Sequence, residues 1–202
     1  MTVVGEACDC QILYGVREVQ FRALTAAGAS IPANPWTATD CPVSIGLDPD
    51  IEEGAKVNLK CGDGIKNTVK ADDQLTGMKI SFAMGCRNPE IEYIIAGSVG
   101  TVTYDVTSPT CAIGYCTPTL AQQALAVPFE MLIYRSEKEG SNDVGFEEIH
   151  LYQCLPAYVT IGGNQEEYGT QEWSISAVEN PNYAVGSDMP VYCWAIVAAI
   201  PA

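Results

Sequence analysis

Length, composition and charge set the first limits. The chain has 202 residues, which fits one large domain or two small ones, and its 48% hydrophobic share is too high for a disordered protein. It carries 10 Lys and Arg against 25 Asp and Glu, a formal net charge of -15, which argues against a protein that grips nucleic acid because phosphate binding needs a basic surface. The only histidine is His150, so sites built from several histidines are excluded.

The charges are unevenly spread along the chain. All ten basic residues lie between Arg17 and Lys138, whereas the stretch from Glu139 to Ala202 carries acids and no Lys or Arg. Two interpretations stay open: a solvated acidic face, or a surface that repels phosphate. The acids of this stretch are Glu139, Asp143, Glu147, Glu148, Glu166, Glu167, Glu172, Glu179 and Asp188.

Alternating apolar and polar residues predict strands through most of the chain. Glu18–Ala23 alternates in this way, and Val57–Cys61 and Ile65–Val69 predict a hairpin around the turn Gly62-Asp-Gly64. Lys56, Lys60, Lys66 and Lys70 all fall on this hairpin. The later predicted strands are Met78–Met84, Phe129–Arg135, Glu147–Gln153, Glu172–Val178 and Pro190–Val197.

One short helix is predicted over Pro89–Ala96. Asn88 is a favourable N-cap, Pro89 suits the first helical position and Gly97 ends the helix. Glu92 and Tyr93 are expected to face solvent or a neighbouring subunit. The stripe expected to pack on the outer face of the sandwich consists of Ile91, Ile94 and Ile95.

The proline-rich stretch Ser30–Glu53 is predicted to be a loop, with a turn at Asp48–Gly54, and so is Tyr104–Pro118. For Thr119–Val127, a second short helix and a loop both stay open. Strands outnumber helices and do not alternate with them regularly. The predicted fold class is therefore mainly β: an antiparallel β-sandwich with one flanking short α-helix.

No residue is predicted to be catalytic, cofactor-binding or metal-ligating. Cys8 and Cys10 share a face of an extended segment, but a closed metal site needs two further ligands. Cys41, Cys61 or His150 would supply them only if the fold happened to bring them close. The alternative is that the nine cysteines are mostly buried, reduced thiols. Whether two of them form one disulfide stays open. Asp48–Gly54 invites a calcium-loop interpretation, but its glycine comes one position late and Leu59 stands where the bidentate glutamate belongs.

A cysteine or serine hydrolase would need His150 as its base. His150 lies in an alternating strand on the same side as Glu148 and Tyr152, which predicts the polar face of a sheet. No G-x-S-x-G motif is present.

The sequence predicts neither a secretion signal nor a membrane anchor. Met1–Cys8 lacks the basic and apolar regions of a signal peptide. Val191–Ala202 is the longest apolar stretch, and a bilayer span needs about 20 residues. We expect it to be a strand buried in the sandwich or against a neighbouring chain.

The stretch from Val57 to Tyr104 resembles the tail tube (major tail) proteins of long-tailed double-stranded DNA bacteriophages, the siphophages of actinobacteria above all. The shared order is a strand ending in a glycine turn, an acidic patch, an alternating strand, a short helix opened by Pro-Glu, and a further strand. The matching segments are Lys60–Gly64, Asp72-Asp73, Leu75–Phe82, Asn88–Gly97 and Val99–Tyr104, with looser matches at Glu172–Ala177 and Glu179–Gly186.

The resemblance implies one tail-tube domain over residues 1–202, with N-terminal and C-terminal arms and long inter-strand loops. It implies self-association into hexameric rings that stack into a tube, with tape measure, tail terminator and tail tip proteins as further partners. The chain would be assembled in the host cytoplasm and located in the virion tail. DNA would pass through the lumen without specific binding, and the excess of acids agrees with such a conduit.

Two alternatives remain from the residues alone. One is an immunoglobulin-like adhesin or fibre domain, a monomeric binding module of similar architecture. The other is an acidic cysteine-dependent enzyme, which would need a pocket that brings His150 to a cysteine.

Overall fold

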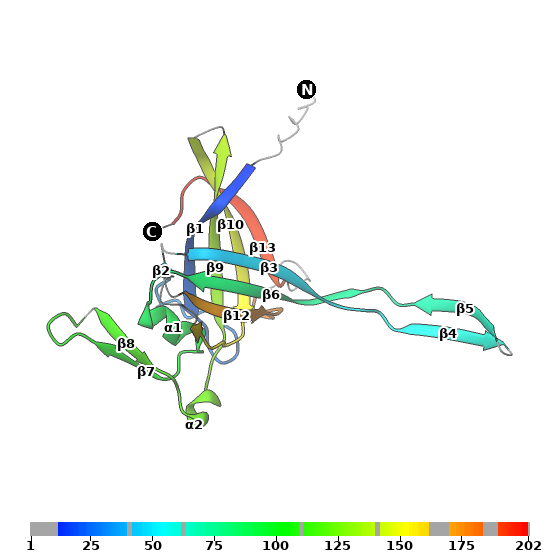
Figure 1. Cartoon of the computed structure of the whole chain (residues 1–202), viewed down its shortest axis with the longest axis horizontal. Coiled ribbons are helices and arrows are strands. Elements are labelled where there is room, and N and C mark those ends of the chain that lie inside the picture. Colours follow the sequence, from blue (N-terminus) through cyan, green and yellow to red (C-terminus); the bar gives the residue numbers. More distant parts are fainter. Residues whose placement is uncertain are drawn as a thin grey trace.

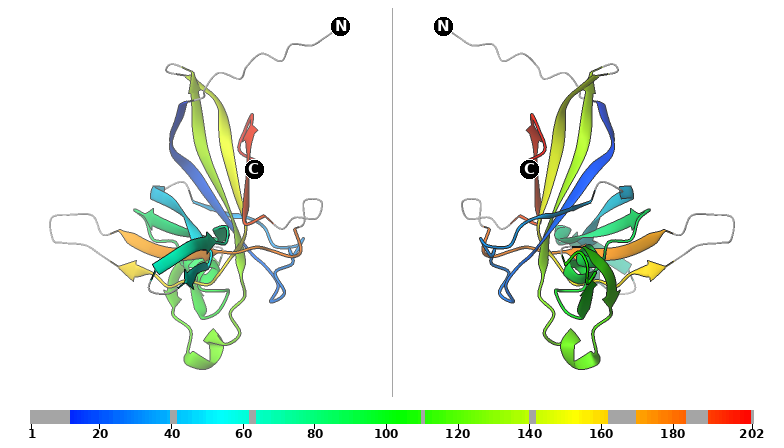
Figure 2. Two further views of the ribbon diagram at one scale, coloured as in Figure 1. Left: turned by 90° about the vertical axis from the view of Figure 1, so that its right-hand side faces the viewer. Right: turned by 90° about the vertical axis from the view of Figure 1, so that its left-hand side faces the viewer.

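A computed structural model describes residues 12–39, 42–61, 64–109, 111–139, 142–161, 170–183 and 190–201. Within these ranges the chain is mainly antiparallel β-structure with two short helices (Figures 1 and 2). The prediction of a mainly β sandwich with a flanking helix is confirmed.

The first layer of the sandwich is built on three long neighbouring strands. In register, Val19 lies opposite Ile133, and Ile133 lies opposite Ile149. The order is β2-β1-β9-β10, and β13 pairs with β10 on its other side. The bounds are β1 (Ile12–Ala23), β2 (Thr37–Thr39), β9 (Phe129–Glu139), β10 (Asn142–Cys154) and β13 (Tyr192–Val197).

The second layer crosses the first, as Figure 1 shows. It has the order β12-β6-β3, with β11 beside β12. The layers form one continuous sheet because β10 pairs with β12 at Cys154 and Ala177. The bounds are β3 (Pro42–Glu52), β6 (Gln74–Met84), β11 (Thr160–Ile161) and β12 (Gln171–Ala177).

The core lies between the two layers and follows the period-two alternation of the strands. The Phe21 ring lies 5.5 Å from the Phe82 ring, and Phe82 stacks on Trp173 at 5.5 Å between ring centroids. Burying each such aromatic side chain contributes about 1.5–3 kcal/mol. The core also contains Val19, Ile80, Met84, Met131, Ile133, Ile149, Leu151 and Ile175.

Helix α1 (Pro89–Ile95) flanks the sandwich as predicted. The Asn88 side chain accepts hydrogen bonds from the backbone N–H groups of Glu90 and Ile91 at 3.0 and 3.3 Å. Gly97 follows the helix with φ +85°, a backbone conformation that glycine adopts without steric cost.

The isoleucine stripe of α1 packs on the core as expected: Ile91 and Ile95 are fully buried, and the partly buried Ile94 packs against the core. One expectation for the faces of α1 is wrong. Glu92, expected to face solvent, is buried and belongs to a hydrogen-bonded cluster described below. The helix has seven residues, about two turns, and consecutive side chains point in different directions around its axis. An error of one position in the predicted buried face therefore moves a side chain between core and solvent.

The predicted loop Ser30–Glu53 is wrong, because it contains β2 and all of β3. The turn expected at Asp48–Gly54 is likewise wrong, since Asp48 to Glu52 continue β3. The strand tolerates Pro42 and Pro49 because β3 is at the end of the strand order and pairs on one side only, with β6.

The predicted loop Tyr104–Pro118 is also partly wrong. It contains β8 (Ala112–Cys116), which pairs with β7 (Thr101–Tyr104) in a separate two-stranded sheet. For Thr119–Val127, where a short helix and a loop both stayed open, the structure has a helix. This helix, α2 (Leu120–Gln123), begins with a capping box between Thr119 and Gln122.

The lysine-rich hairpin is confirmed as β4 (Lys56–Cys61) and β5 (Gly64–Lys70), and it continues β3 and β6 away from the sandwich (Figure 1). We call residues 54–71 the arm. The two residues of its turn, Gly62 and Asp63, lie outside the described residues.

Candidate functional site

The root of the arm is tightly fixed by backbone contacts. The Gly54 N–H donates to Asp73 Oδ1 at 2.9 Å, and the Ala71 N–H donates to the Ala55 carbonyl at 3.0 Å. A Cβ at position 54 would lie 1.9 Å from the Ala71 carbonyl oxygen, so only glycine permits this approach. The arm therefore leaves the sandwich in a defined direction.

The arm is a hairpin with no third strand. Its strands form a sheet of their own, and no other strand in the described ranges pairs with them. Isolated two-stranded hairpins are marginally stable in water, because each has one layer and nothing to pack against. Lys56, Lys60, Lys66 and Lys70 are four of the ten basic residues of the chain. The arm is thus a basic projection from an acidic molecule, and it has the form of an element that binds another molecule.

A groove lies where the two layers of the sandwich separate, beside β13. We call it the seam. It encloses about 340 Å³ between the edge of β13 and the second layer. Its apolar lining consists of Leu47, Pro49, Leu75, Met78, Ile149, Tyr192 and Trp194. Trp194 is 62% exposed although it stands opposite the buried Ile149 in the strand register. The seam therefore exposes the same side of the sheet that elsewhere forms the core.

The seam also contains charged groups. Arg135 Nε donates to Glu147 Oε2 at 2.6 Å. Arg135 and Glu147 are the charged residues of the lining, and they pair with each other.

Free strand edges accompany the seam. β13 pairs with β10 only, and β3 and β2 end the strand order of the main sheet within the described residues. An edge strand presents unpaired backbone N–H and C=O groups that another strand can bind. The expected C-terminal strand is confirmed, but as an edge strand with exposed apolar side chains.

The acids after Lys138 do not form one face. Glu147 points toward the interior and is buried, whereas its neighbour Glu148 accepts a hydrogen bond from Tyr134 at 2.9 Å on the opposite side of the sheet. Glu172 and Glu179 are exposed. Glu166, Glu167 and Asp188 lie outside the described residues.

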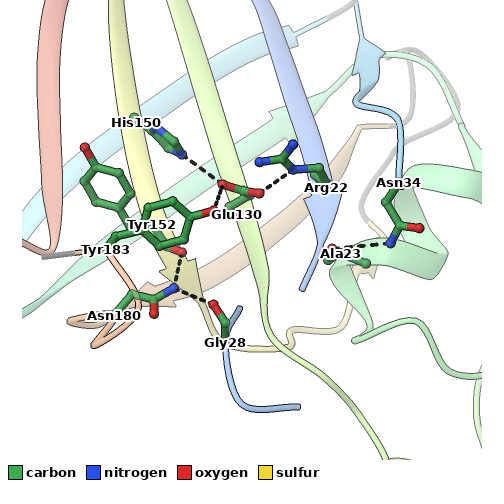
Figure 3. Close-up of polar contacts among 9 residues, drawn as sticks. All are labelled: Arg22, Ala23, Gly28, Asn34, Glu130, His150, Tyr152, Asn180 and Tyr183. Atoms are coloured by element: carbon green, nitrogen blue, oxygen red, sulfur yellow. Dashed lines mark hydrogen bonds and ion pairs between the residues drawn. The ribbon is translucent and has the colours of Figure 1, made fainter. Parts of the chain in front are cut away.

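His150 lies on the polar face of the first layer, as predicted, within a cluster shown in Figure 3. Glu130, fully buried, lies 3.1 Å from His150 Nε2, accepts a hydrogen bond from Arg22 Nε, and accepts one from the Tyr183 hydroxyl at 3.4 Å. Burial alone raises the pKa of Glu130, but the hydrogen bonds and charges of His150 and Arg22 outweigh it and lower this pKa overall.

Aromatic rings surround this cluster. Trp36 lies 4.4 Å from the Arg22 guanidinium, and the Tyr152 ring lies 4.3 Å from the His150 ring. Asn180 donates to the carbonyls of Gly28 and Tyr152 at 2.8 and 2.9 Å (Figure 3). These contacts hold the segments around Gly28 and Asn180 against the sheet. No sequence motif indicated the contacts, because the residues that make them are far apart in the chain.

One thiol lies near His150, a juxtaposition that the sequence did not predict. Cys193 stands opposite His150 in the register of β10 and β13. Burial and the hydrogen bond with Cys193 raise the pKa of Tyr152 to about 12, so Tyr152 remains protonated beside the sulfur. Cys154 is buried, which raises its thiol pKa and keeps the thiol unreactive. The ring contacts and hydrogen bonds of the cluster around Glu130 and His150 hold neighbouring parts of the chain together.

The described residues contain no group of three or more His, Cys, Asp and Glu side chains that could hold a metal ion. Cys8, Cys10 and Cys41 lie outside the described residues, and Cys61 is in the arm. The part of the chain that is described has no helix long and apolar enough to cross a membrane.

Comparison with known proteins finds similarity among solved structures. No protein-family model and no curated protein matches the chain. Among solved structures, the fold is similar to the tube-terminating cap of the anti-feeding prophage, determined by cryo-EM. The TM-score is 0.41 and the sequence identity is 12%, over 98% of this chain and 100% of the cap.

Proposed function

We propose that this chain is a structural tail tube subunit of a long-tailed bacteriophage, which self-associates into hexameric rings that stack into a conduit for DNA. One domain over residues 1–202 forms the subunit, located in the virion tail after assembly in the host cytoplasm. Tape measure, tail terminator and tail tip proteins are its further partners, and it is not an enzyme. The sequence resemblance over Val57–Tyr104 is the origin of this proposal.

The observation that carries the proposal is the arm. A hairpin that continues β3 and β6 beyond the sandwich, with a fixed root and no third strand among the described residues, is suited to contact a second subunit. Free edges at β13 and β3 supply further sites for pairing between chains. When one surface of a copy contacts a different surface of the next copy, the same contact repeats along the series and generates rings or filaments.

The test is assembly of the purified full-length chain. We expect negative-stain microscopy at high protein concentration to show rings and stacked tubes. A variant in which a short glycine turn replaces Lys56–Lys70 should unfold at the same temperature as the wild type and fail to form tubes, because the arm contributes nothing to the core. Because assembly can require the tape measure or tail tip protein, the native particle decides. Absence of this chain from virion tails, or its presence there in only a few copies, overturns the proposal and favours the monomeric adhesin or fibre domain.

A further inference from the structure

We infer that the sandwich is one strand short beside β13, and that a segment of another protein supplies this strand and fills the seam. The segment is extended and uncharged, and apolar side chains occupy every second position of it. This inference does not depend on the proposed self-association, because it rests on the edge of β13 and not on the arm.

Side chains on the core side of the first layer lose their cover at β13. In the register of β10 and β13, Trp194 stands opposite Ile149, and Tyr192 stands opposite Leu151. Ile149 and Leu151 are buried, whereas Trp194 is 62% exposed and Tyr192 is 37% exposed. Ile196, two residues beyond Trp194 on the same side, is exposed as well. A single strand spacing, about 4.8 Å, thus separates the closed core from solvent.

The second layer leaves apolar side chains uncovered on the other side of the seam. Leu75 of β6 is exposed, and Leu47 and Pro49 of β3 line the same groove of about 340 Å³. Side chains alternate between the two faces of a strand, so a strand paired with β13 would direct every second side chain into this groove. Apolar side chains at those positions would complete the core, and the side chains between them would face solvent.

The backbone edge of β13 is unprotected, unlike the edge of β3. Edge strands are commonly blunted by charged residues or prolines, which hinder pairing with another chain. The edge strand β3 contains both, since its sequence is PVSIGLDPDIE. The sequence of β13, YCWAIV, has neither, and among the described strands only β10 pairs with it. An unprotected edge beside an apolar groove is the arrangement used for strand addition, in which backbone hydrogen bonds supply affinity and alternate side chains supply specificity.

Charge sets the chemistry of the added strand. The charged residues of the lining neutralise each other, because Arg135 Nε donates to Glu147 Oε2 at 2.6 Å. A charged side chain entering the seam would therefore be buried without a partner, which is unfavourable. The other edge strands of the main sheet that are described here do not fit: β3 carries acids and prolines, and β2 has three residues. The donor is accordingly a segment of a different protein.

The experiment adds a synthetic peptide to the full-length chain. In this peptide valine alternates with threonine over the length of β13, with glycine and serine at both ends for solubility. Two control peptides have the same valines placed consecutively, or the alternating sequence with N-methylated amides that cannot donate. We expect only the alternating peptide to shield Trp194 from acrylamide quenching of its fluorescence, and Trp194→Phe to remove this change in signal.

A pair of variants provides the second readout. Trp194→Lys places a charge in the seam at a largely exposed position, so it should keep the wild-type unfolding temperature. We expect it to bind the alternating peptide about tenfold or more weakly in calorimetry. Leu125→Lys makes the same kind of change at an exposed apolar position outside the seam and should bind like the wild type.

Two results would overturn the inference. One is that the alternating peptide does not bind, or binds no better than the control peptides. The other is that the wild type without peptide forms a dimer in sedimentation velocity with the amides of β13 protected from hydrogen exchange, and that Trp194→Lys loses both. That outcome would assign the edge of β13 to a second copy. Neither result decides the proposed function, because the presence of the chain in virion tails is measured separately.

Discussion

At the scale of single residues, Glu130 joins three strands of the first layer. Its carboxylate connects β1, β9 and β10 through Arg22 and His150, and connects the segment of Tyr183 to them. A fully buried carboxylate is stable only when such donors surround it. The same donors lower its pKa, which links folding stability to pH.

The pH dependence has a definite sign. Because the pKa of Glu130 is lower in the folded chain than its usual 4.5, the ionised form stabilises the fold above about pH 4.5, and this contribution is lost as pH falls through the folded pKa. We expect Glu130→Gln to lower the free energy of unfolding by about 3 kcal/mol at pH 7, and by less at pH 3. Urea unfolding at the two pH values measures this difference. The exposed Asp48→Asn should leave both values unchanged, and an equal loss for Glu130→Gln at both pH values would contradict the linkage.

At the scale of elements, α1 is held by polar contacts as well as by its isoleucines. Arg87 Nε donates to Glu92 Oε1 at 2.8 Å, and Gln171 Nε2 of β12 donates to the same oxygen at 3.0 Å. The helix is too short to be stable alone, so its attachment to the second layer decides whether it forms.

Removing the carboxylate of Glu92 tests this attachment. Glu92→Ala leaves the buried Gln171 amide without its acceptor, and we expect it to destabilise the chain by about 2 kcal/mol in thermal or denaturant unfolding. Glu92→Gln keeps an acceptor oxygen and should recover part of the loss. Glu90→Ala, on the same helix but not buried, should cost about 0.5 kcal/mol. Equal stabilities of Glu92→Ala and Glu90→Ala would refute this role for Glu92.

At the scale of the whole molecule, charge is separated between a basic arm and an acidic remainder. This separation suits a protein that binds its own copies by attraction of opposite charges and repels phosphate elsewhere.

DNA binding measures this consequence. We expect no measurable affinity of the assembled tube for duplex DNA, even near 0.01 M ionic strength, where the Debye length is roughly 30 Å and electrostatic attraction is strongest. The isolated chain should bind weakly at most, through the arm, and a variant lacking Lys56–Lys70 should lose that binding. Affinity of the tube that persists at low salt would count against a conduit.

The sequence by itself determined part of the local structure. Alternation predicted all or part of β1, β6, β9, β10, β12 and β13 and the lysine hairpin, and Asn88, Pro89 and Gly97 predicted the ends of α1, because these signals depend on neighbours along the chain. It did not predict β3, since prolines look like loop residues unless the strand is known to lie at an edge.

Only the tertiary structure decided which distant groups meet. The pairing of Glu130 with Arg22 and His150, the burial of Glu92 beside Gln171, and the seam between β13 and the second layer all join residues far apart in sequence. A carboxylate in a strand has the same local pattern whether it faces water or a buried donor. Its environment depends on how the layers cross and where they separate, and no local periodicity records that geometry.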